Sequence, residues 1–293
     1  METTAAPAAP TAAAPDPTPL CVSCRTPLLG RYCHACGEKT LHRHDYSLAH
    51  FLEHTLDGLT HFDLRVLRGL GQQLRRPGYL AAEWLRGRRV PHAAPVQLFL
   101  VTNVLFYLIS GKAHFSPFQT QLGSHLSGNF GNLAHQLLAA RLARTGETYA
   151  GFAPRFDELV HVYSKTLVFV FVPLLAGPLA LLCWQQRRYF VEWLTVTLYW
   201  FGGVLLVFGL MAALALSAHF SAAALWFFNN DGLVAPVMFG LTVLYTYFFL
   251  SHALPGSSAL GRVAQAVALV FCFLLALLFP YRLLLFLLTL WTA

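Results

Sequence analysis

The chain has 293 residues, of which 56 % are hydrophobic and only 11 % are charged, with a formal net charge of +7. A soluble protein of this size would carry about a quarter charged residues, so the composition does not fit an entirely soluble protein. Before Pro95 the chain is polar and basic, and after Val162 it is almost continuously Leu, Val, Phe and Ala. The sequence therefore predicts a membrane protein with a soluble N-terminal part.

Residues 1–20 are rich in Ala, Pro and Thr and contain no Lys or Arg. A secretory signal peptide needs a basic start and an apolar stretch, and this segment has neither. We expect a disordered tail here. A later span must then direct insertion into the membrane.

Two Cys-x-x-Cys pairs follow the tail, with eight residues between them. The four cysteines are Cys21, Cys24, Cys33 and Cys36. Pro27 and Gly30 suit a tight hairpin that would bring the pairs together, and four thiolates can surround one tetrahedral Zn²⁺. We therefore predict a zinc ribbon over residues 21–40. Two disulfides or a redox-active Cys-x-x-Cys pair are the alternatives.

Four sulfur ligands leave no open coordination position, so the sequence predicts one structural Zn²⁺ per chain and no catalytic residue at this site. A zinc site of thiolates also indicates a reducing compartment for the N-terminus. The other two cysteines, Cys183 and Cys272, lie singly in apolar runs and are expected to behave as small hydrophobic residues.

Residues 41–94 are predicted to form amphipathic basic helices next to the membrane. Apolar residues recur every three or four positions from Leu48 to Leu74, which is typical of one helical stripe. Asp45 or Ser47 could cap its start. A second helix over 79–86 is expected to end at Gly87 in a left-handed conformation.

Seven arginines and one acidic residue lie within residues 65–89. The arginines are Arg65, Arg68, Arg75, Arg76, Arg86, Arg88 and Arg89. A basic amphipathic segment directly before a span commonly contacts anionic lipid headgroups, and a solvated basic face without a specific partner is the alternative. Nucleic acid is disfavoured, because no recognition motif accompanies the charges.

A polar stripe is expected on the side of the first helix that is opposite to its apolar stripe. It consists of His50, His54, Asp57 and His61. Three imidazoles and a carboxylate are plausible zinc or iron ligands, and adjacent members could share one ion. The stripe is a candidate second metal or polar site. A polar surface without any bound ion is the favoured interpretation, because short spacing matches often arise by chance.

Residues 95–293 contain five apolar runs that predict a polytopic α-helical bundle. The runs are 96–110, 162–184, 194–217, 233–250 and 263–290. A polar segment, 111–161, separates the first two and contains an amphipathic piece near 133–144. The protein is thus expected to be mainly α, with about five spans.

Basic residues in the short connections predict the orientation. Eleven of the twenty Lys and Arg residues precede the first span, and two more lie in the 185–191 loop. With five spans, the N-terminus, this loop and the 251–262 turn share one side. We expect that side to be the cytoplasm and the membrane to be the bacterial inner membrane.

The last apolar run is too long for one straight span, because 28 residues of helix extend about 42 Å whereas the hydrocarbon core is about 30 Å thick. It contains Pro280 and Arg282. We expect the chain to turn at Pro280, with its last eleven residues packed on the outer interface or on neighbouring spans. The competing arrangement is one tilted span with Arg282 buried and paired.

Three short motifs resemble a bacterial family catalogued as domain of unknown function 3667. They are Tyr32-Cys33-x-x-Cys36-Gly37, Arg76-Pro77-Gly78, and Gly87-Arg88-Arg89 followed by Pro95. The resemblance implies a membrane protein with this architecture but no assigned chemistry. Members often carry histidines near the start of the third span, where this chain reads Tyr189-Phe190-Val191-Glu192-Trp193-Leu194, so no role of those histidines can be transferred.

The function favoured by the sequence is an interaction or assembly module, with a protein partner at the ribbon and lipid beneath the basic helix. A small transporter or lipid-handling protein that uses Lys165 and Arg282 in a polar cavity is the alternative. A membrane enzyme that depends on the histidine stripe comes third. A non-enzymatic role is favoured, because no nucleophile–base, phosphate-loop or paired-carboxylate arrangement stands out.

Overall fold

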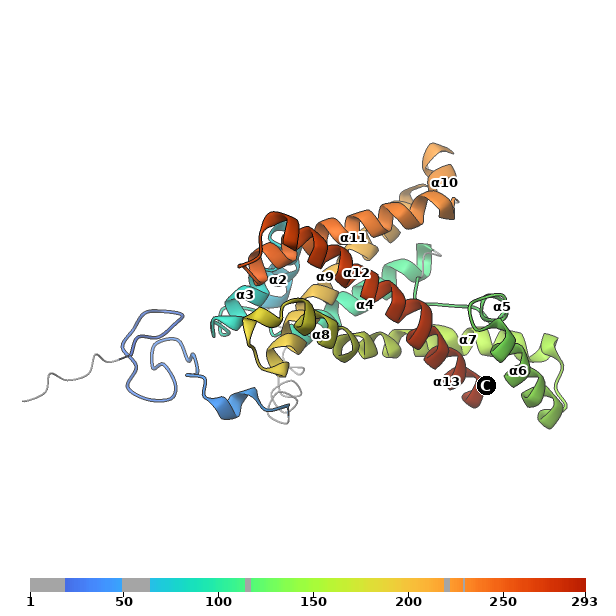
Figure 1. Cartoon of the computed structure of the whole chain (residues 1–293), viewed down its shortest axis with the longest axis horizontal. Coiled ribbons are helices and arrows are strands. Elements are labelled where there is room, and N and C mark those ends of the chain that lie inside the picture. The colour runs from blue at the N-terminus through green and yellow to red at the C-terminus, as the bar shows by residue number, and fades with distance from the viewer. Residues whose placement is uncertain (1–18, 49–63, 114–116, 219–221, 229) are drawn as a thin grey trace, which may run out of the picture.

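The computed structural model describes residues 19–48, 64–113, 117–218, 222–228 and 230–293, and Figure 1 shows the chain. Nearly all regular structure in these ranges is helical. The segment that contains the four N-terminal cysteines, called the N-terminal module below, has two isolated β-bridges, Leu20 with Pro27 and Tyr32 with Lys39. The expected tail up to residue 18 lies outside the described residues. So does the candidate site at His50, His54, Asp57 and His61.

The described residues before the first span contain three short helices. They are η1 (Arg43–Tyr46), α2 (Leu64–Arg75) and α3 (Tyr79–Leu85). The Arg76-Pro77-Gly78 motif separates two helices, since α2 ends at Arg75 and α3 begins at Tyr79. Gly87 has a φ of 85°, so the expected left-handed end of the second helix is confirmed.

Within the described ranges, five helical segments are long and apolar enough to cross a membrane, as the composition predicted. Three of them are single helices: α4 (Pro95–Ala113), α9 (Phe190–Ser217) and α11 (Asp231–Ala253). The other two are composite: α7 (Tyr149–Leu167) with η2 (Val168–Val170) and α8 (Phe171–Leu182), and α12 (Ala259–Ala276) with η5 (Leu277–Tyr281) and α13 (Arg282–Thr292).

The remaining helices lie at the ends of the spans. They are α5 (Leu122–Leu126), α6 (Gly131–Thr145), η3 (Trp184–Gln186) and α10 (Ala222–Phe228). In Figure 1 the helices α5 and α6 lie at the end of the bundle opposite to the N-terminal module. Helix α6 contains the amphipathic piece expected near 133–144.

Three connections meet at one end of the bundle, as the expected topology requires. The Gln186 side-chain amide donates a hydrogen bond to the Pro255 carbonyl oxygen at 3.2 Å. The ring of Tyr46 stacks on that of Tyr189 with centroids 4.7 Å apart. The N-terminal module, the loop after α8 and the turn after α11 are therefore neighbours (Figure 1).

The second span starts earlier than the sequence indicated. We expected it at residue 162, whereas the helix begins at Tyr149, just after Thr148, whose hydroxyl accepts a hydrogen bond from the Gly151 amide. The added turns bury Phe152, Phe156 and Val160, and Phe156 packs on Phe286 of α13 with centroids 5.8 Å apart. Packing on α13 thus stabilises additional turns at the start of this helix. The sequence analysis did not predict these turns, because they contain polar residues.

The expected turn at Pro280 is wrong. The chain continues as helix from Ala259 to Thr292, and Pro280 lies inside a five-residue π-helical segment. Such a segment accommodates the missing proline N–H and the ring without ending the helix. Arg282 lies half-buried beside α5. Its Nε has no hydrogen-bond partner in the described chain. The competing arrangement required a paired arginine, and this pairing is not observed in the described chain either.

Aromatic side chains fill the centre of the bundle, around a residue from a loop. Phe118, between α4 and α5, is fully buried. Its ring contacts those of Phe106, Phe171, Phe201, Phe208, Phe273 and Tyr281. The Tyr281 hydroxyl donates a hydrogen bond to the Phe118 carbonyl oxygen at 3.0 Å, which satisfies a backbone group that the loop brings into the apolar interior.

The turn between α2 and α3 packs directly on α11. Gly78 has a φ of 82° and is buried, and a Cβ atom there would clash with the Phe249 carbonyl oxygen. Gln73 of α2 donates a side-chain hydrogen bond to the Tyr199 carbonyl oxygen of α9. The segment before the first span is therefore part of the helical bundle.

We expect Gly78→Ala to lower the free energy of unfolding by about 2–5 kcal/mol, because it adds both backbone strain and a steric clash. The measurement is thermal unfolding of the purified protein in detergent. Gly71→Ala is the matched control, since its added Cβ meets no atom within 4 Å and alanine favours a helix by about 1 kcal/mol. Equal stability of the two variants would contradict the close packing of α3 on α11.

Candidate metal centre

Each Cys-x-x-Cys pair forms a tight turn with the same backbone pattern. The amide of Cys21 donates to the Thr26 carbonyl oxygen and that of Cys33 to the Glu38 carbonyl oxygen, both at 2.9 Å. The residue after each pair has a left-handed backbone, with a φ of 65° at Arg25 and 77° at Gly37. Local hydrogen bonds thus preform two similar loops that present their sulfur atoms.

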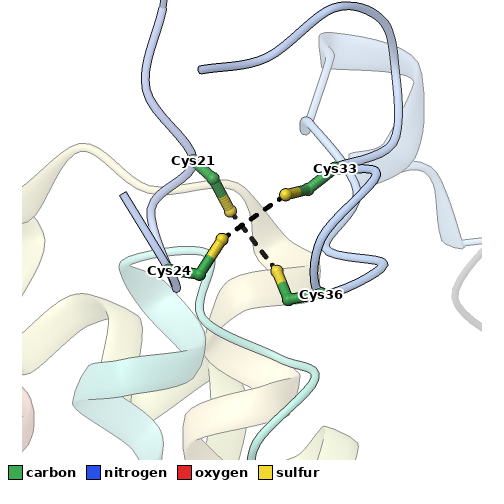
Figure 2. A group of neighbouring side chains, drawn as sticks. All are labelled: Cys21, Cys24, Cys33 and Cys36. Carbon is green, nitrogen blue, oxygen red and sulfur yellow. Dashed lines mark hydrogen bonds between the residues drawn. The ribbon is translucent and has the colours of Figure 1, made fainter. Parts of the chain in front are cut away.

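The two loops bring all four cysteines together. Figure 2 shows the side chains pointing toward a common centre. The Sγ atoms of Cys21 and Cys36 are 3.6 Å apart and those of Cys24 and Cys33 are 3.4 Å apart. The four ligand atoms all lie within 4.8 Å of one another, so they could hold a metal ion. The cysteines are free thiols rather than disulfides.

The environment of Cys24 favours its thiolate form. The hydroxyl of Thr26 lies 3.2 Å from the Cys24 Sγ. Hydrogen bonds from this hydroxyl and from the Thr26 backbone amide lower the pKa of the Cys24 thiol to about 6. Because the thiolate is the form that binds a metal ion, this contact favours Cys24 as a ligand. The opposite holds for Cys36: the Glu38 amide lowers the pKa of its thiol, but burial and the neighbouring cysteines outweigh this and raise that pKa to about 12.

Glu38 connects the metal centre to the segment before the first span. Its side chain is only 3 % exposed. It accepts a hydrogen bond from the Ser23 hydroxyl at 2.5 Å and others from the amides of Arg89 and Val90 at 3.1 and 3.2 Å. We did not select Glu38 from the sequence, and only its position directly after Cys36-Gly37 could have singled it out.

Asp45 is buried beside two basic residues, and the first turns of the helix that it or Ser47 was expected to cap lie outside the described residues. Its buried carboxylate is 2.6 Å from the Lys39 Nζ and 3.2 Å from the Arg31 guanidinium. Burial disfavours the charged form, but the contacts with Lys39, the His42 amide and Arg31 outweigh it and hold the pKa of Asp45 well below its usual range. Through these ion pairs, Asp45 holds the segment that follows the second cysteine pair against the N-terminal module.

The seven arginines of the basic segment lie in different environments. Arg86 and Arg88 each lie 2.6 Å from a carboxylate oxygen of the buried Glu83, and Arg65 donates to the Val90 carbonyl oxygen at 2.7 Å. The remaining exposed members are Arg68, Arg75 and Arg76. Intramolecular contacts therefore already use several charges that the sequence analysis assigned to lipid.

Arg89 is the most enclosed of these arginines. Its Cζ lies 5.1 Å from the centroid of the Trp84 ring, a cation–π contact. Burial lowers the pKa of its guanidinium, and its Nε is buried without a hydrogen-bond partner in the described chain.

A polar cavity shared by Lys165 and Arg282 is not observed among the described residues. Lys165 is exposed on α7. The cavity beside Arg282 has a volume of about 10 Å³ and is lined also by His125 and Phe286, which is about the space of one water molecule. The described geometry gives the transporter alternative no substrate-sized site at these two residues.

Residues 63–107 match a family described as "Protein of unknown function (DUF3667)". The matched region covers α2, α3 and the first part of α4, and it includes Arg76-Pro77-Gly78 and Gly87-Arg88-Arg89. This match supports the resemblance seen in the sequence, and the cysteine pairs lie outside it. The chain has no significant match among curated proteins or among solved structures.

The left-handed backbone at Arg25 and at Gly37 predicts that substitutions at these two positions change the stability of the N-terminal module in opposite directions. Arg25→Gly should stabilise the N-terminal module by about 1 kcal/mol, and Gly37→Ala should destabilise it by a similar amount, because only glycine adopts this conformation without strain. The readout is the chelator concentration at which the full chain releases its metal. Gly30→Ala is the control, since its Cβ would meet no atom within 4 Å. The same midpoint for all three variants would contradict the described loops.

Proposed function

We propose that the chain is a multi-pass protein of the bacterial inner membrane whose N-terminal ribbon holds one structural Zn²⁺ and serves as an interaction or assembly module. The observation that carries this proposal is the convergence of four thiols on one point. A set of four thiolates occupies every position of a tetrahedral ion and leaves none for a substrate. A closed metal centre of this kind supports a binding surface rather than a reaction.

The sulfur positions suit zinc. With Zn–S bonds of about 2.3 Å, the edges of a tetrahedron of sulfur atoms are about 3.8 Å long. The measured separations of 3.4 and 3.6 Å, with all pairs within 4.8 Å, bracket this length. When bound, Zn²⁺ would cross-link the two loops, while Cys21 and Cys33 anchor it from the buried side. The resulting rigid module would keep its outer face in one conformation.

Several apolar side chains of the ribbon are exposed. Leu29 is 82 % exposed and Tyr32 is 59 % exposed, and Leu20 and Val22 are each about half exposed. Such a group on a small rigid module supports a protein partner at the ribbon.

The arrangement at the membrane supports a cytoplasmic N-terminus. The ribbon, the loop with Arg187 and Arg188, and the turn after α11 lie at one end of the bundle, and basic residues accumulate on the cytoplasmic side of membrane proteins. Helix α2 exposes Arg68 and Arg75. These arginines, together with Arg76 and Arg65, are proposed to contact anionic lipid headgroups.

We expect the purified protein to contain one zinc ion per chain. Cys33→Ser should abolish binding, because three thiolates and a hydroxyl hold Zn²⁺ far less tightly than four thiolates. Metal analysis of protein purified without added zinc provides the measurement. Cys272→Ser is the control, since this half-buried cysteine lies in α12. A metal-free wild type with its four ribbon cysteines in disulfides would refute the proposed zinc site.

The interaction role predicts partners that depend on the ribbon. We expect affinity purification of the full chain from native membranes to yield proteins that are lost with Cys33→Ser and with Leu29→Ser. Leu48→Ser is the control, because Leu48 is 50 % exposed but lies outside the ribbon. If the same proteins are recovered with all of these variants, the ribbon is not the interaction surface.

A further inference from the structure

A cavity of about 300 Å³ lies between the ribbon and the membrane bundle. Its lining residues come from three segments, within residues 32–46, 84–97 and 191–195. The last two segments include the first turns of α4 and α9. The cavity is therefore located where the spanning helices begin, at the depth of lipid headgroups if those helices cross a bilayer.

Arg89 supplies to this cavity a positive charge that has no direct ion pair in the described chain. Its guanidinium rests on the Trp84 ring, and Trp84 is held in turn by an edge contact with Tyr199 at a centroid distance of 6.2 Å. Within the described chain, Arg89 makes no ion pair, and its buried Nε has no hydrogen-bond partner. A desolvated guanidinium of this kind gains most from an anionic ligand that its planar fork can bind.

The carboxylates that line the cavity are already engaged by other groups. Glu38 accepts hydrogen bonds from the Arg89 and Val90 amides, and Asp45 pairs with Lys39. Glu192 pairs with Arg188 at 3.3 Å and accepts a hydrogen bond from the Tyr189 amide at 2.9 Å. Glu38 and Asp45 lie close enough to favour the charged form of Arg89, but no described lining carboxylate forms an ion pair with its guanidinium.

Much of the remaining wall is apolar. It includes Leu41, Leu85, Ala94, Pro95, Val96 and Val191. Arg89 lies among these groups rather than in open solvent. The cavity thus offers one cationic contact and an apolar surface, which matches a ligand that has a small anionic head and a hydrocarbon part.

We propose that this cavity binds a phosphate or carboxylate group that carries an apolar chain, with Arg89 as its charge partner. The ribbon then forms one wall of a ligand site, in addition to any role in binding a protein. An anionic lipid of the bilayer and a soluble organic phosphate share this chemistry. The inference does not depend on the proposed protein partner.

Native mass spectrometry of the full-length protein in detergent can test the site. The probes are dioleoylphosphatidylglycerol as an anionic lipid, dodecyl phosphate as a soluble amphiphile, and dioleoylphosphatidylcholine as the neutral control. We expect one equivalent of an anionic probe to bind saturably to the wild type. Arg89→Gln should weaken that binding about 10- to 100-fold, because a hydrogen bond to a charged group is lost from a desolvated site.

Arg86→Gln is the matched control. Arg86 is exposed, pairs with Glu83 and does not line the cavity, so its removal should change the affinity by no more than about twofold. A second variant, Thr195→Phe, keeps Arg89 but should fill the cavity from the buried first turns of α9, and it should weaken binding as well. The zinc content and the elution volume of each variant report whether it is folded.

The two anionic probes distinguish the source of the ligand. Arg89-dependent binding of phosphatidylglycerol alone identifies a bilayer lipid, and Arg89-dependent binding of dodecyl phosphate alone identifies a soluble ligand; either result supports the site. Unchanged binding in both Arg89→Gln and Thr195→Phe would overturn it, as would the absence of saturable binding to the wild type. Loss of partner proteins with Leu29→Ser while lipid binding persists would separate this site from the interaction role.

Discussion

The Glu38 carboxylate joins the module that contains the four clustered cysteines to the membrane bundle. It receives the Ser23 hydroxyl from the first cysteine loop and the amides of Arg89 and Val90 from the segment before α4. A buried carboxylate without these donors would be strongly destabilising, because an unsatisfied charged group costs more than the 1–3 kcal/mol of a neutral one. Both the orientation of the ribbon on the bundle and the cavity beneath it depend on this contact.

Sequence patterns predicted the features that depend on local chemistry. The cysteine spacing indicated that four thiols would meet at one point, the long apolar runs indicated five spans, and Gly87 was correctly expected to be left-handed. The features that were missed depend on contacts between distant residues. The ion pairs of Asp45 are one such feature, because only the folded chain brings Arg31 and Lys39 to it. The early start of α7 likewise depends on α13, which follows more than a hundred residues later.

The basic segment shows how burial separates residues that look equivalent in a sequence. Arg86 and Arg88 neutralise the buried Glu83, and a buried carboxylate requires such partners. Arg89 is held on an aromatic ring inside a cavity, whereas Arg68 and Arg75 stay on the surface of α2. A charge count predicts the same attraction to anionic lipid for all of these arginines. In the folded chain they have three different environments: an ion pair with a buried carboxylate, an aromatic ring in a cavity, and the exposed surface of a helix.

The spanning helices differ greatly in length. Helix α4 has 19 residues, whereas the composite segments Tyr149–Leu182 and Ala259–Thr292 have 34 each, which correspond to about 28 and 51 Å at 1.5 Å per residue. The hydrocarbon core is about 30 Å thick, so α4 matches it while the long pair exceeds it. Since α7 packs on α13, the excess length is concentrated on one side of the bundle. The first turns of α7 carry Arg155, Asp157 and Glu158 and extend into water, whereas Ala259–Thr292 is apolar along most of its length. A bilayer around this protein must therefore thicken, or this segment must tilt, on the side of α12 and α13, and the elastic deformation of the membrane will be asymmetric around the molecule.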